Sequence, residues 1–193
     1  MKTITIEGQL RSEFGKKATR QVRSEGQVPC VIYGGADTVN FSAPATAFKD
    51  LVYTPDFQLV EIKLGSKTYR CVLKDKQFNT VTDELSHMDF LELVEDKPVS
   101  VTLPIKITGQ SEGVKAGGKL VVKIKALKVK ALPKHLRENL EVNIDNLELN
   151  GNVRVEDVVA ENIEILNSPR IPIASVVMTR QLRQEEAQEG KKK

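Results

Sequence analysis

The chain has 193 residues and a formal net charge of only +3 at pH 7. This length allows one large domain or two small ones, each with its own core, and the small charge argues only weakly for a nucleic-acid partner. No apolar run reaches the roughly 20 residues of a membrane span, and the opening MKTITIEG lacks the apolar region of a signal peptide.

The first predicted element is a half-buried strand at Thr3–Leu10. Polar and apolar residues alternate there, with Ile4, Ile6 and Leu10 on one side.

Residues 16–25 predict a short helix that ends at Gly26. Basic side chains gather on one of its faces when successive residues are placed about 100° apart. These side chains are Lys16, Lys17, Arg20 and Arg23, with Arg11 shortly before the helix. Such a face can simply be solvated. It can also bind the phosphates of a nucleic acid, because each cation displaces condensed counterions.

A buried strand is predicted at Val28–Tyr33, and the glycine pair Gly34 and Gly35 ends it. Tyr33 can be an ordinary core residue with a satisfied hydroxyl group. It can also offer its ring or its hydroxyl to a nucleotide.

The next segments complete the first half of the chain. Val39–Ser42 is compatible with a short strand, and Pro44 opens one or two helical turns. Phe57–Leu64 and Lys67–Lys74 predict a hairpin with a two-residue Gly-Ser loop. The polar residues 74–84 predict an irregular segment.

Leu85–Leu93 predicts a strand with two different faces. Met88 and Phe90 point one way, whereas His87 and Asp89 point the other way, two residues apart. A surface histidine commonly has no function, but this pair can form a small polar platform. A histidine can stack on a base or donate to a phosphate, and an aspartate can accept a hydrogen bond from a base edge.

We place a domain boundary at the polar segment Glu95–Pro98. Val99–Ile107 then predicts a regular strand, and its outward-pointing Pro104 indicates an edge strand. After a glycine-rich loop, the apolar pattern of Lys119–Leu132 changes phase at Ala126, which predicts a bulge or a break between strands.

The last elements are short strands and a tail. Leu140–Ile144 predicts a strand, Asn150 with Gly151 predicts a hairpin turn, and Ile171–Val177 predicts the final strand. Residues 180–193 predict a disordered charged tail.

The charge of the second half is polarised along the sequence. Residues 113–137 hold seven lysines and one arginine without any acidic residue. Residues 138–164 hold eight acidic residues against Arg154 alone.

The chain shows no pattern of a catalytic or cofactor site. Gly113–Leu120 has the spacing of a phosphate-binding loop, but Leu120 stands where Ser or Thr would hold magnesium, and a strand follows. A glycine-rich connector is therefore predicted. Cys30 and Cys71 lie in apolar strands, which predicts buried thiols, and two cysteines cannot form a zinc site alone. We expect no enzyme, no cofactor and no metal.

Three motifs in this order resemble the bacterial large-subunit ribosomal protein twenty-five family, in its two-domain CTC form. They are R-x-x-x-G-K-x-x-x-R from Arg11, V-P-C-V-I-Y-G-G from Val28 and H-M-D-F from His87. The second half resembles the family's C-terminal domain through V-S-V-T-L-P-I-K from Val99, the loop at residues 113–118 and L-P-K from Leu132. Thr19 departs from the family, which often carries another arginine there, so that contact is not carried over.

The resemblance implies a mainly β fold with a few short helices (α+β). It implies an RNA-binding β-barrel over residues 1–94 and a β-rich domain over residues 95–179, followed by the tail at 180–193. It also implies a cytoplasmic, ribosome-associated constituent of the large subunit that binds 5S ribosomal RNA. We expect no membrane partner and a monomer off the ribosome.

The residues expected to contact RNA come from two sources. The family's contacts match Arg11, Lys16, Arg20, Tyr33, His87 and Asp89, with Gln77 and Gly34 as additions. The helix pattern alone adds Lys17 and Arg23.

Two other functions remain open at this point. A tRNA-binding module would be similar to the anticodon-binding barrel of glutaminyl-tRNA synthetase. An enzyme that uses His87 and Asp89 as acid and base would need a pocket, whereas the sequence shows a flat strand face.

Overall fold

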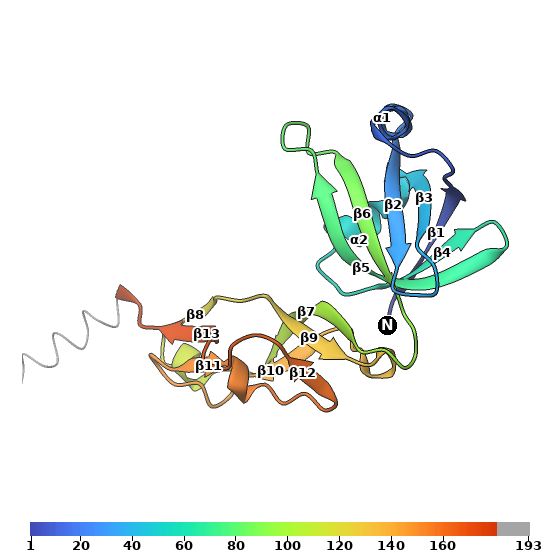
Figure 1. Ribbon diagram of the computed structural model, residues 1–193. Helices are drawn as coiled ribbons and strands as arrows, with labels where there is room; N and C mark the ends of the chain where they lie inside the picture. The colour runs from blue at the N-terminus through green and yellow to red at the C-terminus, as the bar shows by residue number, and fades with distance from the viewer. Residues whose placement is uncertain (181–193) are drawn as a thin grey trace, which may run out of the picture. The chain divides into compact units, whose positions relative to one another are not determined.

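Six strands of the first half close into a barrel with the order β1-β3-β2-β6-β5-β4 (Figure 1). The strands are β1 (Thr3–Leu10), β2 (Gln27–Tyr33), β3 (Val39–Pro44), β4 (Leu59–Leu64), β5 (Lys67–Phe78) and β6 (Leu85–Glu92). β1 with β4 and β2 with β6 pair in parallel, and the remaining neighbours are antiparallel. This computed structural model describes residues 1–180, and the predicted mainly β fold with an N-terminal barrel is confirmed. The part of the predicted tail at residues 181–193 lies outside the described residues.

Apolar side chains at alternate positions fill the barrel. Three phenylalanines form its centre: Phe90 lies 5.9 Å from Phe41 and 6.1 Å from Phe48, measured between ring centroids. Phe48 belongs to η1 (Ala45–Phe48), which continues into α2 (Lys49–Tyr53). Burying one such ring stabilises the fold by about 1.5–3 kcal/mol. The predicted helical turns after Pro44 are therefore a part of the barrel's core.

The predicted basic helix is confirmed as α1 (Lys16–Ser24). It begins after Gly15 and ends before Gly26, whose φ angles of 98° and 75° are in the left-handed region that favours glycine. Figure 1 shows α1 at one end of the barrel. None of its residues is fully buried, so its position depends on a few specific contacts.

Two details of the barrel differ from the prediction. Leu10 was expected on the inner side together with Ile4 and Ile6, but it is 66% exposed. The reason is that Leu10 is the last residue of β1 and lies outside the packed core. Residues 75–78 were expected to be irregular, but they continue β5 beside β6. Their side chains are all exposed, and the pairing shifts between Leu73 and Asp75, so no apolar alternation marked this strand.

Two sheets form in the second half of the chain. The first has the order β10-β7-β9-β12 and the second has the order β11-β13-β8. The strands are β7 (Val99–Thr108), β8 (Lys119–Val122), β9 (Ala126–Ala131), β10 (Leu140–Asn143), β11 (Asn152–Arg154), β12 (Ile163–Ile165) and β13 (Pro172–Val177). The helical turns are α3 (Glu112–Lys115), η2 (Pro133–His135) and η3 (Val155–Asp157). Leu103, Leu127 and Ile173 are fully buried, and the predicted β-rich second half is confirmed.

The break predicted at Ala126 is confirmed, because β8 and β9 belong to different sheets. The edge position predicted from Pro104 is wrong, because β7 lies between β10 and β9. β10 pairs with β7 only from Ile105 onward, so the proline falls just before that pairing begins. The hairpin predicted at Asn150 is also wrong, because β11 pairs with β13 and not with the residues before Asn150.

The chain divides into two compact units, residues 1–101 with 131–138, and residues 102–130 with those from 139 onward. The predicted boundary between residues 94 and 95 stays a prediction. No helix within residues 1–180 is long and apolar enough to cross a membrane.

Candidate nucleic-acid interface

A pair of polar side chains stands on the outer face of β6. His87 Nδ1 lies 2.7 Å from Asp89 Oδ1, and the two side chains are 30% and 28% exposed. Met88 and Phe90, which alternate with them along β6, are completely buried, as the alternation of side chains in a strand predicts. Because the carboxylate occupies Nδ1, the imidazole is held in one orientation and Nε2 is the nitrogen left for a ligand.

The neighbouring strands add polar groups beside this pair. On β5, Gln77 lies opposite His87, and Asp75 lies opposite Asp89. On β2, Tyr33 lies opposite Leu91 of β6, which follows Phe90. Burial raises the pKa of Tyr33, and the charges of Asp89 and Asp75 raise it further, so its hydroxyl stays a neutral donor. We call Tyr33, Gln77, His87 and Asp89 the polar platform.

Asp75 is a member of this surface that the sequence analysis missed. Its place directly opposite Asp89 puts two carboxylates side by side, an arrangement that destabilises a sheet. The signal was hidden because residues 75–78 have no apolar alternation and were not recognised as strand.

Arg23 joins the basic helix to the platform. Its Nε and Nη2 atoms donate to the backbone carbonyl of Ser86, at 2.9 Å and 2.8 Å. Ser86 directly precedes His87, so this bidentate contact fixes α1 beside the platform. Arg23 was predicted as an RNA contact from the helix pattern alone, and the structure gives it a positioning contact across 63 residues of sequence. No local pattern could have indicated this partner.

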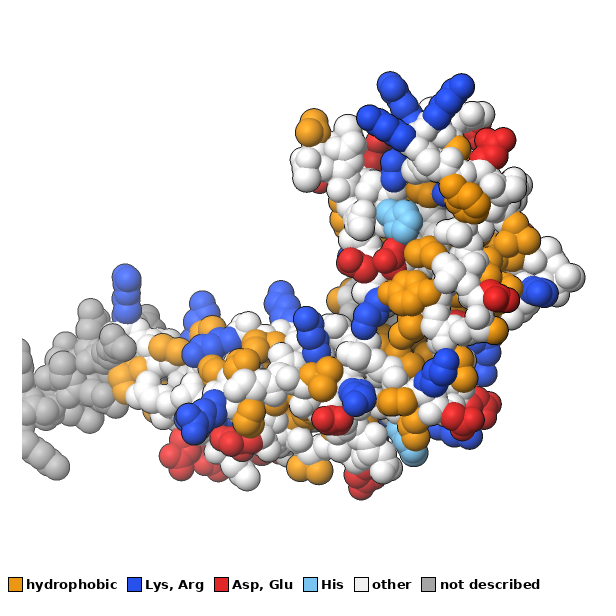
Figure 2. Space-filling model, in the orientation of Figure 1, with side chains coloured by type: hydrophobic (Ala, Val, Ile, Leu, Met, Phe, Trp, Pro, Cys, Tyr) orange, Lys and Arg blue, Asp and Glu red, His pale blue; other side chains and the backbone are white. Residues whose placement is uncertain are grey.

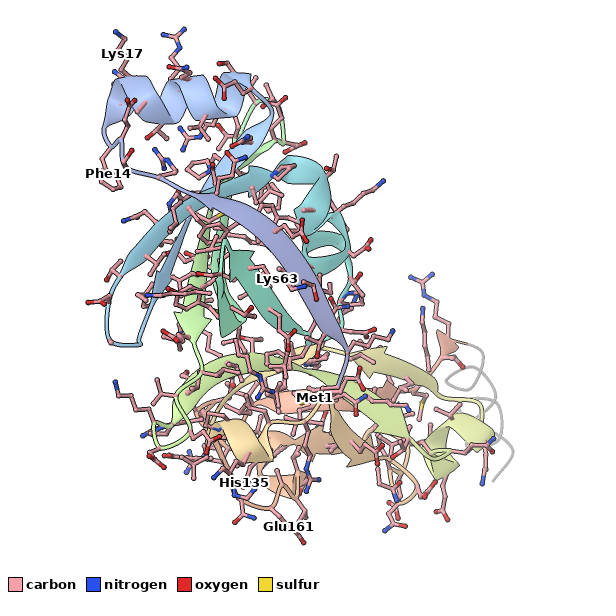
Figure 3. All side chains as sticks on the ribbon, turned by 90° about the vertical axis from the view of Figure 1, so that its right-hand side faces the viewer. Met1, Phe14, Lys17, Lys63, His135 and Glu161 are labelled. Atoms are coloured by element: carbon pink, nitrogen blue, oxygen red, sulfur yellow. The ribbon has the colours of Figure 1, made fainter. Side chains whose placement is uncertain are left out.

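The other predicted cations differ in how firmly they are held. Arg11 is half-buried, and its Nη2 donates to the Glu13 carbonyl at 3.2 Å and lies 3.5 Å from the Thr19 hydroxyl. Lys16, Lys17 and Arg20 are exposed, and no carboxylate of residues 1–180 lies within ion-pair distance of them. We call these three residues the cation row. Figure 2 shows the blue side chains of α1 projecting away from the barrel, and Figure 3 shows Lys17 pointing outward from α1.

Gly34 has a structural reason to be glycine. Its φ is 97°, and an added Cβ would lie 2.6 Å from a methyl carbon of Leu91. Lys97 Nζ donates to its carbonyl oxygen at 3.3 Å. The turn therefore brings the backbone against β6 immediately after Tyr33.

The buried cysteines and the glycine-rich loop have structural explanations. Burial raises the pKa of Cys71 to about 12 and also raises the pKa of Cys30, so both thiols stay protonated. Gly113 packs so closely that a Cβ would lie 2.6 Å from the backbone of Glu148, which accounts for glycine in that loop. No three His, Cys, Asp or Glu residues within residues 1–180 gather at metal-binding distances.

Arg23 also lines a groove of about 440 Å³. Among its lining residues are Lys49 and Tyr53 of α2, Asp83 of the loop before β6 and Leu85, the first residue of β6. The sequence analysis did not find it, because α2 and this loop are separated along the chain.

Both halves of the chain match known protein families. Residues 6–90 match the family described as "Ribosomal L25p family", and residues 98–180 match "Ribosomal protein TL5, C-terminal domain". "Large ribosomal subunit protein bL25" of Porphyromonas gingivalis is 40% identical over 185 residues, which cover 95% of this chain and 96% of that protein. The proteins of the same name from Cytophaga hutchinsonii and Amoebophilus asiaticus are 41% and 42% identical, and each match covers 100% of both chains.

Proposed function

The chain belongs to the bL25 family and is a structural constituent of the large ribosomal subunit, and within that subunit we propose that its barrel binds 5S ribosomal RNA. Proteins of this family are structural components of the ribosome and not enzymes, in agreement with the prediction from sequence. We also propose that the free protein is a cytoplasmic monomer.

The observation that carries the proposal is that two kinds of polar group lie on the same barrel, the cation row on α1 and the polar platform along β2, β6 and β5, and that Arg23 joins them. The cation row supplies charges without partners, which suits the sequence-independent contacts that RNA-binding proteins make to phosphates. The polar platform beside it offers a carboxylate, an imidazole, an amide and a phenol, which suit base edges and riboses. Arg23 holds the two parts at a fixed separation.

Specificity for RNA of one shape follows from this rigidity. The platform lies on three adjacent strands of a closed barrel, so its groups cannot spread apart to follow an arbitrary surface. A regular A-form helix hides its major-groove base edges in a deep, narrow groove that side chains do not reach. We therefore infer that the bound RNA is a distorted helical segment whose base edges reach the platform while its phosphates reach α1.

Titration of 5S RNA with the full chain at several salt concentrations tests the proposal. Lys16→Ala and Arg20→Ala should each lower the slope of log affinity against log salt by about 0.7–0.9. Lys63→Ala, which removes an exposed lysine from β4, should leave the slope unchanged. Unchanged slopes for the α1 variants would mean that α1 is merely a solvated helix.

Competition separates the two RNA classes. Unlabelled 5S RNA should displace labelled 5S RNA at far lower concentration than unlabelled tRNA does. Equal displacement by tRNA would support the tRNA-binding module instead.

A further inference from the structure

The second unit carries its charges on separate parts of its surface. Its lysines from Lys115 to Lys130 belong to α3, β8, β9 and the turns beside them, and its acidic residues from Glu141 to Glu164 belong to β10, η3, β12 and the loops between them. Within this unit, Figure 2 shows blue side chains along the edge where Figure 1 draws β8, and most of the red side chains along the opposite edge.

Most of these lysines do not pair with the nearby acidic residues. Lys130 Nζ lies 3.9 Å from Glu164, and Lys115 lies close enough to Asp145 to help lower the pKa of that carboxyl. Four others are exposed and have no carboxylate of residues 1–180 within ion-pair distance. These are Lys119, Lys123, Lys125 and Lys128, and we call them the lysine edge.

Protection of a strand edge explains only one member of this group. β8 pairs with β13 on one side alone among the described strands, and edge strands often carry lysines that prevent further pairing. Lys119 fits that role. Lys123 and Lys125 lie between the two strands, and Lys128 belongs to β9, which is paired on both sides.

The chemistry of the lysine edge distinguishes between possible partners. Protein partners are typically held by aromatic and arginine side chains at the centre of an interface, and single-stranded RNA is held by stacking on aromatic rings. No Phe, Tyr or Trp follows Phe90 in the sequence, and none of the four members is an arginine. Separate point charges without rings instead suit the phosphates of a double helix.

We propose that the lysine edge is a second RNA-binding site, which contacts the phosphate backbone of double-helical RNA without reading its sequence. It is separate from the 5S site proposed on the barrel, and it does not depend on that proposal. A protein with both sites would join two RNA segments of the large subunit.

The test uses the full chain with Lys16→Ala and Arg20→Ala, so that the barrel contributes less to binding. The probes are a short RNA duplex unrelated to 5S RNA, a single-stranded RNA of equal charge, and poly-glutamate. Into this background we introduce Lys123→Gln, Lys125→Gln and Lys128→Gln together. Duplex affinity should fall at least about tenfold, and the salt slope should fall by about 2–3, one contact for each lysine.

A matched control removes the same charge from the barrel. Lys2→Gln, Lys63→Gln and Lys67→Gln change exposed lysines of the first unit and should alter duplex affinity less than about twofold. Replacing the three lysine-edge residues by arginine should restore duplex binding, which shows that a Gln variant failed by losing charge and not by unfolding.

Three results would overturn the proposal. If the Gln variant and the barrel control lost equal duplex affinity, the loss would come from the lower net charge and not from a site at the lysine edge. Tighter binding of single-stranded RNA, or equally tight and equally lysine-dependent binding of poly-glutamate, would contradict a double-helix site. If the background protein, before the Gln changes, bound no duplex measurably, the proposed site would not exist.

Discussion

Replacing Asp89 by asparagine separates hydrogen bonding from charge at the polar platform. Asp89 Oδ1 lies 2.7 Å from His87 Nδ1, and both side chains are about 30% exposed. Partly exposed pairs contribute up to about 1 kcal/mol, so Asp89→Asn should lower the unfolding free energy by no more than that.

Two opposite effects act on RNA binding. Removing the negative charge relieves repulsion from phosphates by about 0.6 kcal/mol, for a separation near 7 Å in water. Losing the carboxylate acceptor and the orientation of His87 costs about 1–3 kcal/mol. The second effect is larger, so Asp89→Asn should weaken 5S RNA binding by about tenfold.

Asp75→Asn is the matched control, because it removes the same charge from the position opposite Asp89 without touching the bond to His87. By charge alone it should tighten binding by up to about threefold. It should also slightly raise stability, because it relieves a like-charged cross-strand pair. Fluorescence anisotropy at fixed salt, together with melting curves, measures both variants. A shift of both affinities in the same direction would refute the assignment of Asp89 as an acceptor.

Further variants test the remaining structural claims. Arg20→Ala should weaken RNA binding without changing stability. Arg23→Ala should weaken RNA binding and also lower the protection of α1 amides from hydrogen exchange, because it removes the contact to the β6 backbone. Equal protection of these amides in both variants would contradict the positioning role of Arg23. The pKa of Cys71 rises from 9.0 to about 12 on folding, so the folded thiol keeps a proton that the unfolded thiol loses. Each of the two buried thiols should therefore cost about 1 kcal/mol of stability per pH unit above pH 9. Urea unfolding of Cys71→Ala should show about half the wild-type slope, because burial also raises the pKa of Cys30, and an unchanged slope would contradict the assignment. Gly113→Ala should lower the stability of the second unit by about 1–3 kcal/mol, because the added Cβ meets rigid backbone, and it should leave 5S RNA binding unchanged.

The sequence predicted the barrel's elements well where one face is buried. In β6, the alternation of His87 and Asp89 with Met88 and Phe90 placed every side chain on the correct face. The helical turns predicted after Pro44 bury Phe48, Leu51 and Val52 on one side. Burial on one side of an element creates the periodic pattern, so such elements can be recognised without a structure.

The elements that were missed have no such pattern. The end of β5 is solvated on both faces, so nothing in residues 75–78 indicated a strand. The turn at Asn150 has the residue types of a hairpin, but β11 pairs with β13 and not with the residues just before the turn. Local turn chemistry cannot decide between partners that only the tertiary fold brings together.

The candidate site shows the same division. The helix period identified the cation row, and strand parity identified His87 with Asp89. The contact of Arg23 with Ser86 and the opposition of Asp75 to Asp89 depend on how separate segments pack, and neither has a sequence signal.

Directed hydroxyl-radical cleavage tests the central claim most directly. The native Cys30 and Cys71 are buried and will not react, so an iron chelate can be attached to a single cysteine introduced as Lys17→Cys or Lys63→Cys. Lys17 lies on α1, whereas Lys63 lies on β4, which is opposite β2 around the barrel (Figure 3). If the α1 end of the barrel binds 5S RNA, the chelate at position 17 will cleave a short segment of that RNA, and the chelate at position 63 will not. Cleavage of 5S RNA from position 63 alone, or equal cleavage from both positions, would contradict it.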